Sequence, residues 1–131
     1  NERAACIALI ERIRKICVFD TSCSCGNFLL VSYKELNLLL SKIATSAGKT
    51  EIPLMPITNF YGIESNPFSC AIARMGLLFV VLQNKETTLS TVRANIDVLF
   101  SNNIVTANPT RIPWDSICSG IAETYIIGNP S

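Results

Sequence analysis

The hydrophobic positions near the N-terminus repeat with helical spacing. Over residues 3–17 one apolar stripe occupies positions i, i+3, i+4, i+7 and i+11, and charged side chains lie on the other side. This spacing predicts an amphipathic helix. The stripe consists of Cys6, Leu9, Ile10, Ile13 and Cys17.

A second helix is predicted after a turn rich in Asp, Ser, Gly and Asn at residues 20–27. Ser32 and Glu35 have the spacing of a capping box, and an apolar stripe follows as far as Ala47. A start near Asn27 would add one turn to this helix, so both starts stay open.

A third helix is predicted to begin at Pro67, because proline suits the first helical position. The segment 68–82 carries only one charged residue, Arg74. A helix that is apolar all round is expected to be the central and most buried element. The segment is too short to span a membrane, so we expect no membrane span.

Two more helices complete the pattern. The fourth follows Thr87 or Thr88 and extends its apolar face to Leu99. The fifth aligns the apolar residues Trp114, Ile117, Cys118, Ile121 and Tyr125. The predicted fold class is therefore all-α: a single helical domain over residues 1–131, built as a disulfide-linked bundle of about five helices around a buried central helix.

The composition excludes several kinds of chemistry. The chain has 131 residues and no histidine, and 11 Lys and Arg residues nearly balance 10 Asp and Glu residues. The missing histidine removes the commonest general base and the His-containing zinc sites. A net charge of +1 gives no basic footprint for nucleic acid. We therefore expect no catalytic residue, no cofactor, no metal and no nucleic-acid partner.

An enzyme without histidine could still use paired carboxylates. Two of the candidates, Glu51 and Glu64, flank the first proline-bearing loop. The glycines are scattered and form no phosphate-cradling loop. Isolated surface carboxylates are the preferred interpretation, so we expect a protein that is not an enzyme. The candidate carboxylates are Glu51, Glu64, Asp97, Asp115 and Glu123.

The six cysteines favour an oxidising compartment and three disulfides. Together with a first residue that is not methionine, they predict a secreted, processed protein. A Cys6–Cys17 bond is excluded by a separation of about 16 Å on one helix, and a Cys23–Cys25 bond by ring strain. The remaining pairings stay open. The predicted disulfide residues are Cys6, Cys17, Cys23, Cys25, Cys70 and Cys118.

Apolar side chains in the two proline-bearing loops suggest a surface that binds a partner. Aromatic and arginine side chains dominate binding hot spots in protein interfaces. The alternative function is an extracellular helical carrier of a small hydrophobic ligand. The candidate partner-binding residues are Met55, Phe60, Tyr61, Arg111, Ile112 and Trp114.

The chain resembles the small helical salivary proteins of anopheline mosquitoes, the salivary gland protein 7 family. The resemblance is carried by the opening 1–6, the turn 21–26 and the late helix with Cys118. It implies a secreted inhibitor that binds a host plasma protein complex, the alternative-pathway C3 convertase of complement. Such a protein would serve immune evasion by binding and not by catalysis.

Overall fold

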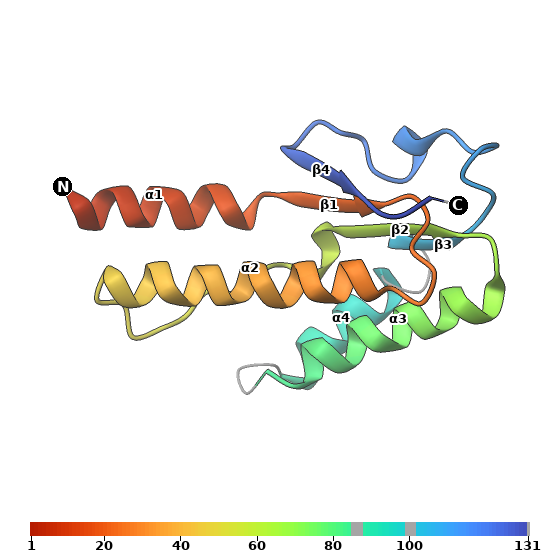
Figure 1. Cartoon of the computed structure of the whole chain (residues 1–131). Helices are drawn as coiled ribbons and strands as arrows, with labels where there is room; N and C mark the ends of the chain where they lie inside the picture. The colour runs from red at the N-terminus through yellow and green to blue at the C-terminus, as the bar shows by residue number, and fades with distance from the viewer. Residues whose placement is uncertain (85–87, 99–101, 131) are drawn as a thin grey trace.

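The computed structural model, which describes residues 1–84, 88–98 and 102–130, contains a parallel β-sheet (Figure 1). Its strands are β1 (Cys17–Asp20), β2 (Phe60–Glu64), β3 (Ile104–Thr106) and β4 (Thr124–Ile127). They lie in the order β3-β2-β1-β4, and all three pairs are parallel. The prediction of an all-α bundle is wrong, because the fold is α/β.

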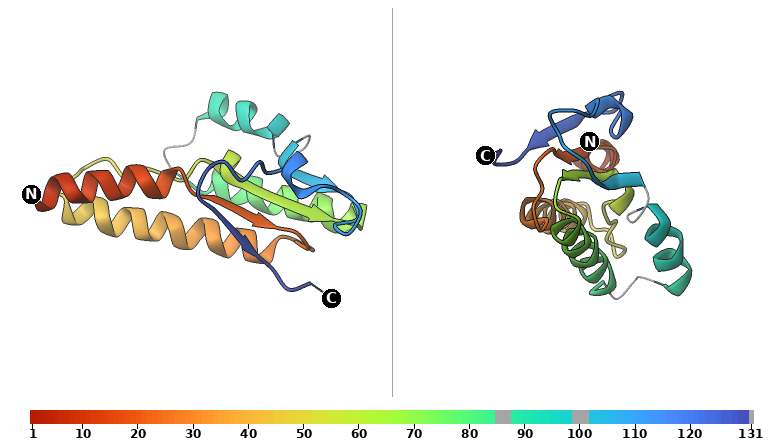
Figure 2. Two further views of the ribbon diagram at one scale, coloured as in Figure 1. Left: turned by 90° about the horizontal axis from the view of Figure 1, so that it is seen from above. Right: turned by 90° about the vertical axis from the view of Figure 1, so that its right-hand side faces the viewer.

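Helices cover one face of this sheet and an irregular segment covers the other (Figures 1 and 2). Helices α2 and α3 pack on β1, β2 and β3, while residues 107–120 lie across the opposite face. The helical elements are α1 (Glu2–Arg14), α2 (Asn27–Ser46), η1 (Ile57–Asn59), α3 (Pro67–Leu82), α4 (Leu89–Val98) and η3 (Trp114–Ser116).

The sheet separates two apolar clusters. The larger one lies between the sheet and the helices and includes Leu29 and Leu40 of α2, Phe60 of β2 and Leu77 of α3. The smaller one lies beneath residues 107–120 and includes Phe19 of β1. All four residues of β1 are buried, since both faces of this strand are covered.

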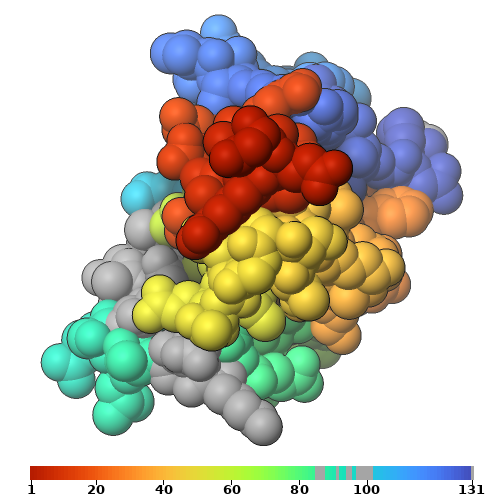
Figure 3. Space-filling model, turned by 90° about the vertical axis from the view of Figure 1, so that its left-hand side faces the viewer, coloured from red at the N-terminus to blue at the C-terminus, as the bar shows by residue number. Residues whose placement is uncertain are grey.

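The first two helices differ from their predicted bounds. Helix α1 ends at Arg14, and Cys17 begins β1. Helix α2 begins at Asn27, so the earlier of the two open starts is correct. Ser32 lies inside this helix, where its hydroxyl donates to the Phe28 carbonyl oxygen at 2.7 Å and caps nothing. Figure 3 shows the N-terminal end of α1 against the C-terminal part of α2.

Helix α3 has the predicted start, and Asn66 caps it by accepting from the amides of Phe68 and Ser69. It is not buried all round, however. Phe68 is 74% exposed and Phe79 56% exposed, while the face with Cys70 and Leu77 packs inward. The prediction of a buried central helix is therefore wrong, because α3 covers one side of a sheet.

The structure contains the fourth predicted helix but not the fifth. Helix α4 begins at Leu89, while Thr87 and Leu99 lie outside the described residues. The fifth helix is wrong: Trp114 lies in the short η3, and Tyr125 lies in β4. Within the part of the chain that the structure describes, no helix is long and apolar enough to cross a membrane.

Asn103 immediately precedes β3, and its side chain hydrogen-bonds the segment that leads into β2. Its buried side-chain amide donates to the carbonyl oxygens of Thr58 at 2.7 Å and Phe60 at 3.0 Å. Asn103→Ala leaves both carbonyls without this donor, so we expect a loss of about 1–3 kcal/mol in the free energy of unfolding. Chemical denaturation measures the loss. Asn102→Ala, at the exposed neighbouring position, is the control; equal stability of both variants would contradict the assigned role.

Candidate functional site

The carboxyl ends of the four parallel strands meet at one edge of the sheet. Asp20 ends β1, Glu64 ends β2 and Gly128 follows β4. The chain passes from β1 to β2 and β3 on one side, and β4 then lies on the other side of β1. In open α/β sheets, ligands bind outside the carboxyl ends of the strands where the strand order reverses. This rule places the candidate site beside Asp20.

Asp20 is a fully buried carboxylate with an unsatisfied oxygen. Its side chain is 0% exposed, and its Oδ1 accepts from the Ser22 amide at 3.0 Å. Its Oδ2 has no hydrogen-bond partner among the described residues. Because buried polar atoms are nearly always paired, this oxygen indicates a place for a ligand donor.

Burial raises the pKa of the Asp20 carboxyl above its usual value. The amide of Ser22 acts in the opposite direction, and the negative charge of Glu64 raises the pKa further. A positively charged group placed beside Oδ2 would stabilise the ionised carboxylate. The site is therefore electrostatically prepared for a cation.

Gly128 allows β4 to end directly against Asp20. A Cβ at this position would lie 2.5 Å from Asp20 Oδ1, and the φ of +139° also favours glycine. The close approach brings the next residue, the exposed Asn129, to the same edge of the sheet. The amide side chain of Asn129 therefore follows Gly128, the residue in close contact with the Asp20 carboxylate.

The loop 21–26 joins Asp20 to helix α2 and is fixed at both ends. The Cys23 amide donates to the Ile63 carbonyl oxygen at 2.9 Å, and the Gly26 amide donates to the Cys23 carbonyl oxygen at 2.7 Å. Gly26 has a φ of +86°, and a Cβ there would lie 3.0 Å from the Cβ of Ala73 in α3. Contacts with β2 and α3 therefore determine the shape of the loop.

The N-terminus of α2 faces this loop without a side-chain cap. Its N-cap residue is Gly26, and its first turn carries no acidic residue. The first amides of a helix have no partner within the helix, and they carry partial positive charge that favours an anion. One short loop thus has the Asp20 carboxylate, which favours a cation, at one end and the first amides of α2, which favour an anion, at the other.

Glu64 adds a second carboxylate at the same edge. Its Oε2 accepts from the Asn66 amide at 2.6 Å, which orients the side chain at the end of β2. In doubly wound nucleotide-binding folds, an acidic residue at the second strand binds the hydroxyls of a ribose. Glu64 is therefore suited to a ribose diol.

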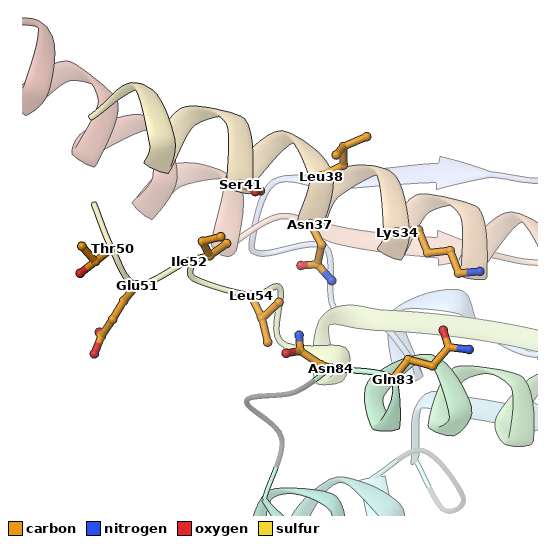
Figure 4. Close-up of a pocket in the computed structure, with 10 residues that line it drawn as sticks. All are labelled: Lys34, Asn37, Leu38, Ser41, Thr50, Glu51, Ile52, Leu54, Gln83 and Asn84. Atoms are coloured by element: carbon orange, nitrogen blue, oxygen red, sulfur yellow. The ribbon is translucent and has the colours of Figure 1, made fainter. Parts of the chain in front are cut away.

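A cavity lies elsewhere on the molecule and does not include this edge (Figure 4). Its volume is about 800 Å³, and it lies between α2, the segment before η1 and the end of α3. Glu51 lines it from the connecting segment, whereas Glu64 is at the far end of β2. Glu51 and Glu64 therefore do not form a catalytic pair.

The other candidate carboxylates are also dispersed. Glu123 accepts from Arg12 through both carboxylate oxygens, at 3.0 and 3.1 Å, and this pairing lowers the pKa of Glu123. Asp115 is exposed in η3. The side chain of Asp97 lies outside the described part of the structure.

All six cysteines are free thiols in the structure. Cys23 and Cys70 pack in the larger core cluster, and Cys17 and Cys118 pack together in the smaller one. Burial raises the pKa of the Cys23 thiol to about 12, with the charge of Asp20 as a further cause. Buried cysteines of this kind behave as small apolar side chains.

The six candidate partner-binding residues do not form one exposed patch. Met55 and Phe60 are buried in the core, and Tyr61 and Ile112 are partly buried around Phe19. Trp114 is partly exposed and stacks edge-on against Phe19, and Arg111 is exposed. A role in partner binding stays a prediction for the exposed members of the set.

Comparison with known proteins gives two matches. Residues 1–131 match the family model described as MmeI, DNA-methyltransferase domain. The chain is 32% identical over 133 residues to DNA methyltransferase A of Bacillus subtilis strain 168. The alignment covers 93% of this chain but only 15% of that protein's length. No solved structure matches.

These similarities contradict the functional expectations from the sequence. The resemblance to mosquito salivary proteins is wrong, and so are the secreted complement inhibitor and the hydrophobic-ligand carrier. The expectations of a protein that is not an enzyme, of a host plasma partner, and of no nucleic-acid partner are contradicted as well. A secreted location is also contradicted, which removes the premise for structural disulfides.

One signal in the sequence could have identified the site. A short apolar run ends at Asp20, small polar residues follow as far as Gly26, and an apolar helix comes next. This strand, glycine-ended turn and helix are the start of a βαβ unit. This pattern is masked because Cys17 also fits the helical spacing of the preceding segment.

Asp20→Asn tests the buried charge. Because the pKa of Asp20 is raised in the folded state, its ionisation opposes folding: stability is lost as the pH rises from the unfolded toward the folded pKa. The amide can still accept from Ser22 but cannot ionise. We expect Asp20→Asn to be more stable than the wild type at pH 7, with the difference shrinking as the pH falls and absent below about pH 4, where the wild-type carboxyl is protonated in both states.

Thermal unfolding across pH measures this difference. Asp115→Asn removes the same charge at an exposed position and serves as the control. If Asp20→Asn is less stable than the wild type at pH 7, the ionised carboxylate is satisfied inside the protein and the assigned vacancy beside Oδ2 is wrong.

Proposed function

Because this chain belongs to the MmeI DNA-methyltransferase domain family, we propose that the strand edge at Asp20 binds S-adenosylmethionine, the methyl donor of DNA methylation. The observation that supports this most directly is the buried Asp20 Oδ2, which lacks a partner, beside the uncapped N-terminus of α2. When bound, S-adenosylmethionine supplies a methyl group on a sulfonium centre.

The amino-acid end of this donor fits the two ends of the loop 21–26. Its ammonium group can donate to Asp20 Oδ2, and its carboxylate can accept from the first amides of α2. A site that offers one carboxylate and one helix N-terminus is complementary to a zwitterion. This pairing distinguishes an amino-acid group from a phosphate, which would face the Asp20 carboxylate with a second negative charge.

The adenosine part fits the next strand along the sheet. Glu64 ends β2, the neighbour of β1, and its carboxylate can accept from both hydroxyls of a ribose. The donor carries a positive sulfonium in addition to its ammonium, so two nearby carboxylates favour it over an anionic dinucleotide. The bulky base would then lie toward the carboxyl end of β3.

The methyl acceptor is proposed to approach from β4. DNA methyltransferases extrude the target base from the duplex before the reaction. Asn129 follows Gly128 at this edge, and its amide oxygen can accept a hydrogen bond from an exocyclic amino group of such a base. This contact would orient the nitrogen toward the donor bound beside Asp20.

The net charge of this chain is only +1, which gives little electrostatic attraction for a DNA duplex. With 11 basic and 10 acidic residues, it offers few phosphate contacts, and phosphate contacts provide most of the affinity for DNA. The curated relative extends far beyond the matched region. We therefore assign donor binding to this chain and attribute most of the duplex affinity to other parts of such longer proteins.

Donor binding is the direct test of this proposal. Isothermal titration calorimetry with S-adenosylmethionine should show binding by the wild type, and Asp20→Asn should raise the dissociation constant about tenfold to a hundredfold. The loss is expected because the neutral amide cannot pair with the ammonium group. Glu51→Gln, which removes a charge in the remote cavity, is the matched control.

Two results would contradict the proposal. One is a folded wild-type chain that does not bind the donor at millimolar concentration. The other is binding that Asp20→Asn and Glu51→Gln leave equally strong, since the donor would then lie elsewhere on the molecule.

A further inference from the structure

Ser24 has a backbone conformation that residues with side chains seldom adopt. Its φ is +50°, and among the described residues it is the only one other than glycine with a positive φ. The left-handed region places the Cβ of an L-residue too close to its own backbone, which is why glycine usually occupies it. Strain of this kind persists only where the surrounding structure enforces it.

The neighbouring hydrogen bonds show what enforces it. Cys23 to Gly26 form a four-residue turn that the Gly26 amide closes on the Cys23 carbonyl oxygen at 2.7 Å. The Cys23 amide is bound to the Ile63 carbonyl oxygen in β2 at 2.9 Å. Ser24 occupies the second position of this turn, where left-handed turns favour Gly, Asn or Asp. It cannot relax without releasing the loop from the sheet.

The side chain of Ser24 has no structural role to offset this strain. Ser24 is exposed, and its hydroxyl has no hydrogen-bond partner within the described residues. A glycine would form the same turn without strain. A hydroxyl at a strained and exposed position of the loop, with no partner within the described residues, suggests that its partner is a bound molecule.

The position of Ser24 indicates which part of the ligand it meets. The loop runs from the carboxylate of Asp20 to the amides at the start of α2, and Ser24 lies between them. We propose that the Ser24 hydroxyl donates a hydrogen bond to the carboxylate of the donor's amino-acid end, alongside the amides of α2. This inference rests on the proposed binding of S-adenosylmethionine.

Two substitutions separate the hydroxyl from the strain. Ser24→Ala removes the hydroxyl and keeps a Cβ at the left-handed position, whereas Ser24→Gly removes both. We expect each to weaken S-adenosylmethionine binding about tenfold, because each loses a hydrogen bond to a charged group. Ser24→Gly should also raise the melting temperature, which shows that the weaker binding does not come from a damaged fold.

A second ligand identifies the group that the hydroxyl contacts. Decarboxylated S-adenosylmethionine keeps the sulfonium, the adenosine and the amine but lacks the carboxylate. The wild type should bind it more weakly than the complete donor, and the Ser24 variants should bind it as well as the wild type does. Isothermal titration calorimetry with both ligands on all three proteins gives the full comparison.

The outcomes distinguish this inference from the function on which it rests. A wild type that binds no donor overturns both. Donor binding that is weakened by Asp20→Asn but unchanged by Ser24→Ala overturns only the role of Ser24. An equal loss of affinity for both ligands in Ser24→Ala also overturns it, because the hydroxyl would then contact some group other than the carboxylate.

Discussion

The parallel pairing of β1 between β2 and β4 is the constraint on which the rest of the site depends. Val18 lies opposite both Phe60 and Tyr125, so the three strands end at a common edge. This register brings Asp20 together with residues that follow it by more than a hundred positions. Antiparallel pairing would send the ends of neighbouring strands to opposite edges and would separate these groups.

The same edge concentrates features that oppose folding. It holds a buried carboxylate without a full set of partners and a serine in a left-handed conformation. The remainder of the loop is anchored to β2 and packed against α3, above a well-filled apolar core. The packed sheet and helices hold the loop in a conformation that it would not keep in isolation. Strained residues of this kind commonly occur at binding sites, where the rest of the fold compensates for their cost.

Local signals in the sequence predicted the helices better than the strands. Pro67 suits the first helical position by its own chemistry, and the start of α3 that it predicted is confirmed. The strands are only three to five residues long and carry no such signals. Tyr125 fits a helical stripe with Trp114 as well as it fits β4. The number of cysteines wrongly favoured a secreted protein for a similar reason. A cysteine count alone does not distinguish buried free thiols from disulfides.

By itself, the sequence determined the start of α3 at Pro67 and the presence of the longer helices, because those depend on residues within a few positions of one another. It also contained the apolar run to Asp20, the small polar turn and the helix after it. Only the tertiary structure decided that this turn is a site. The reason is physical: the vacancy beside Asp20 Oδ2, the close approach of Gly128 and the anchoring of Cys23 to Ile63 are contacts between distant segments. Such contacts arise from strand register and packing, which no local pattern of residues specifies.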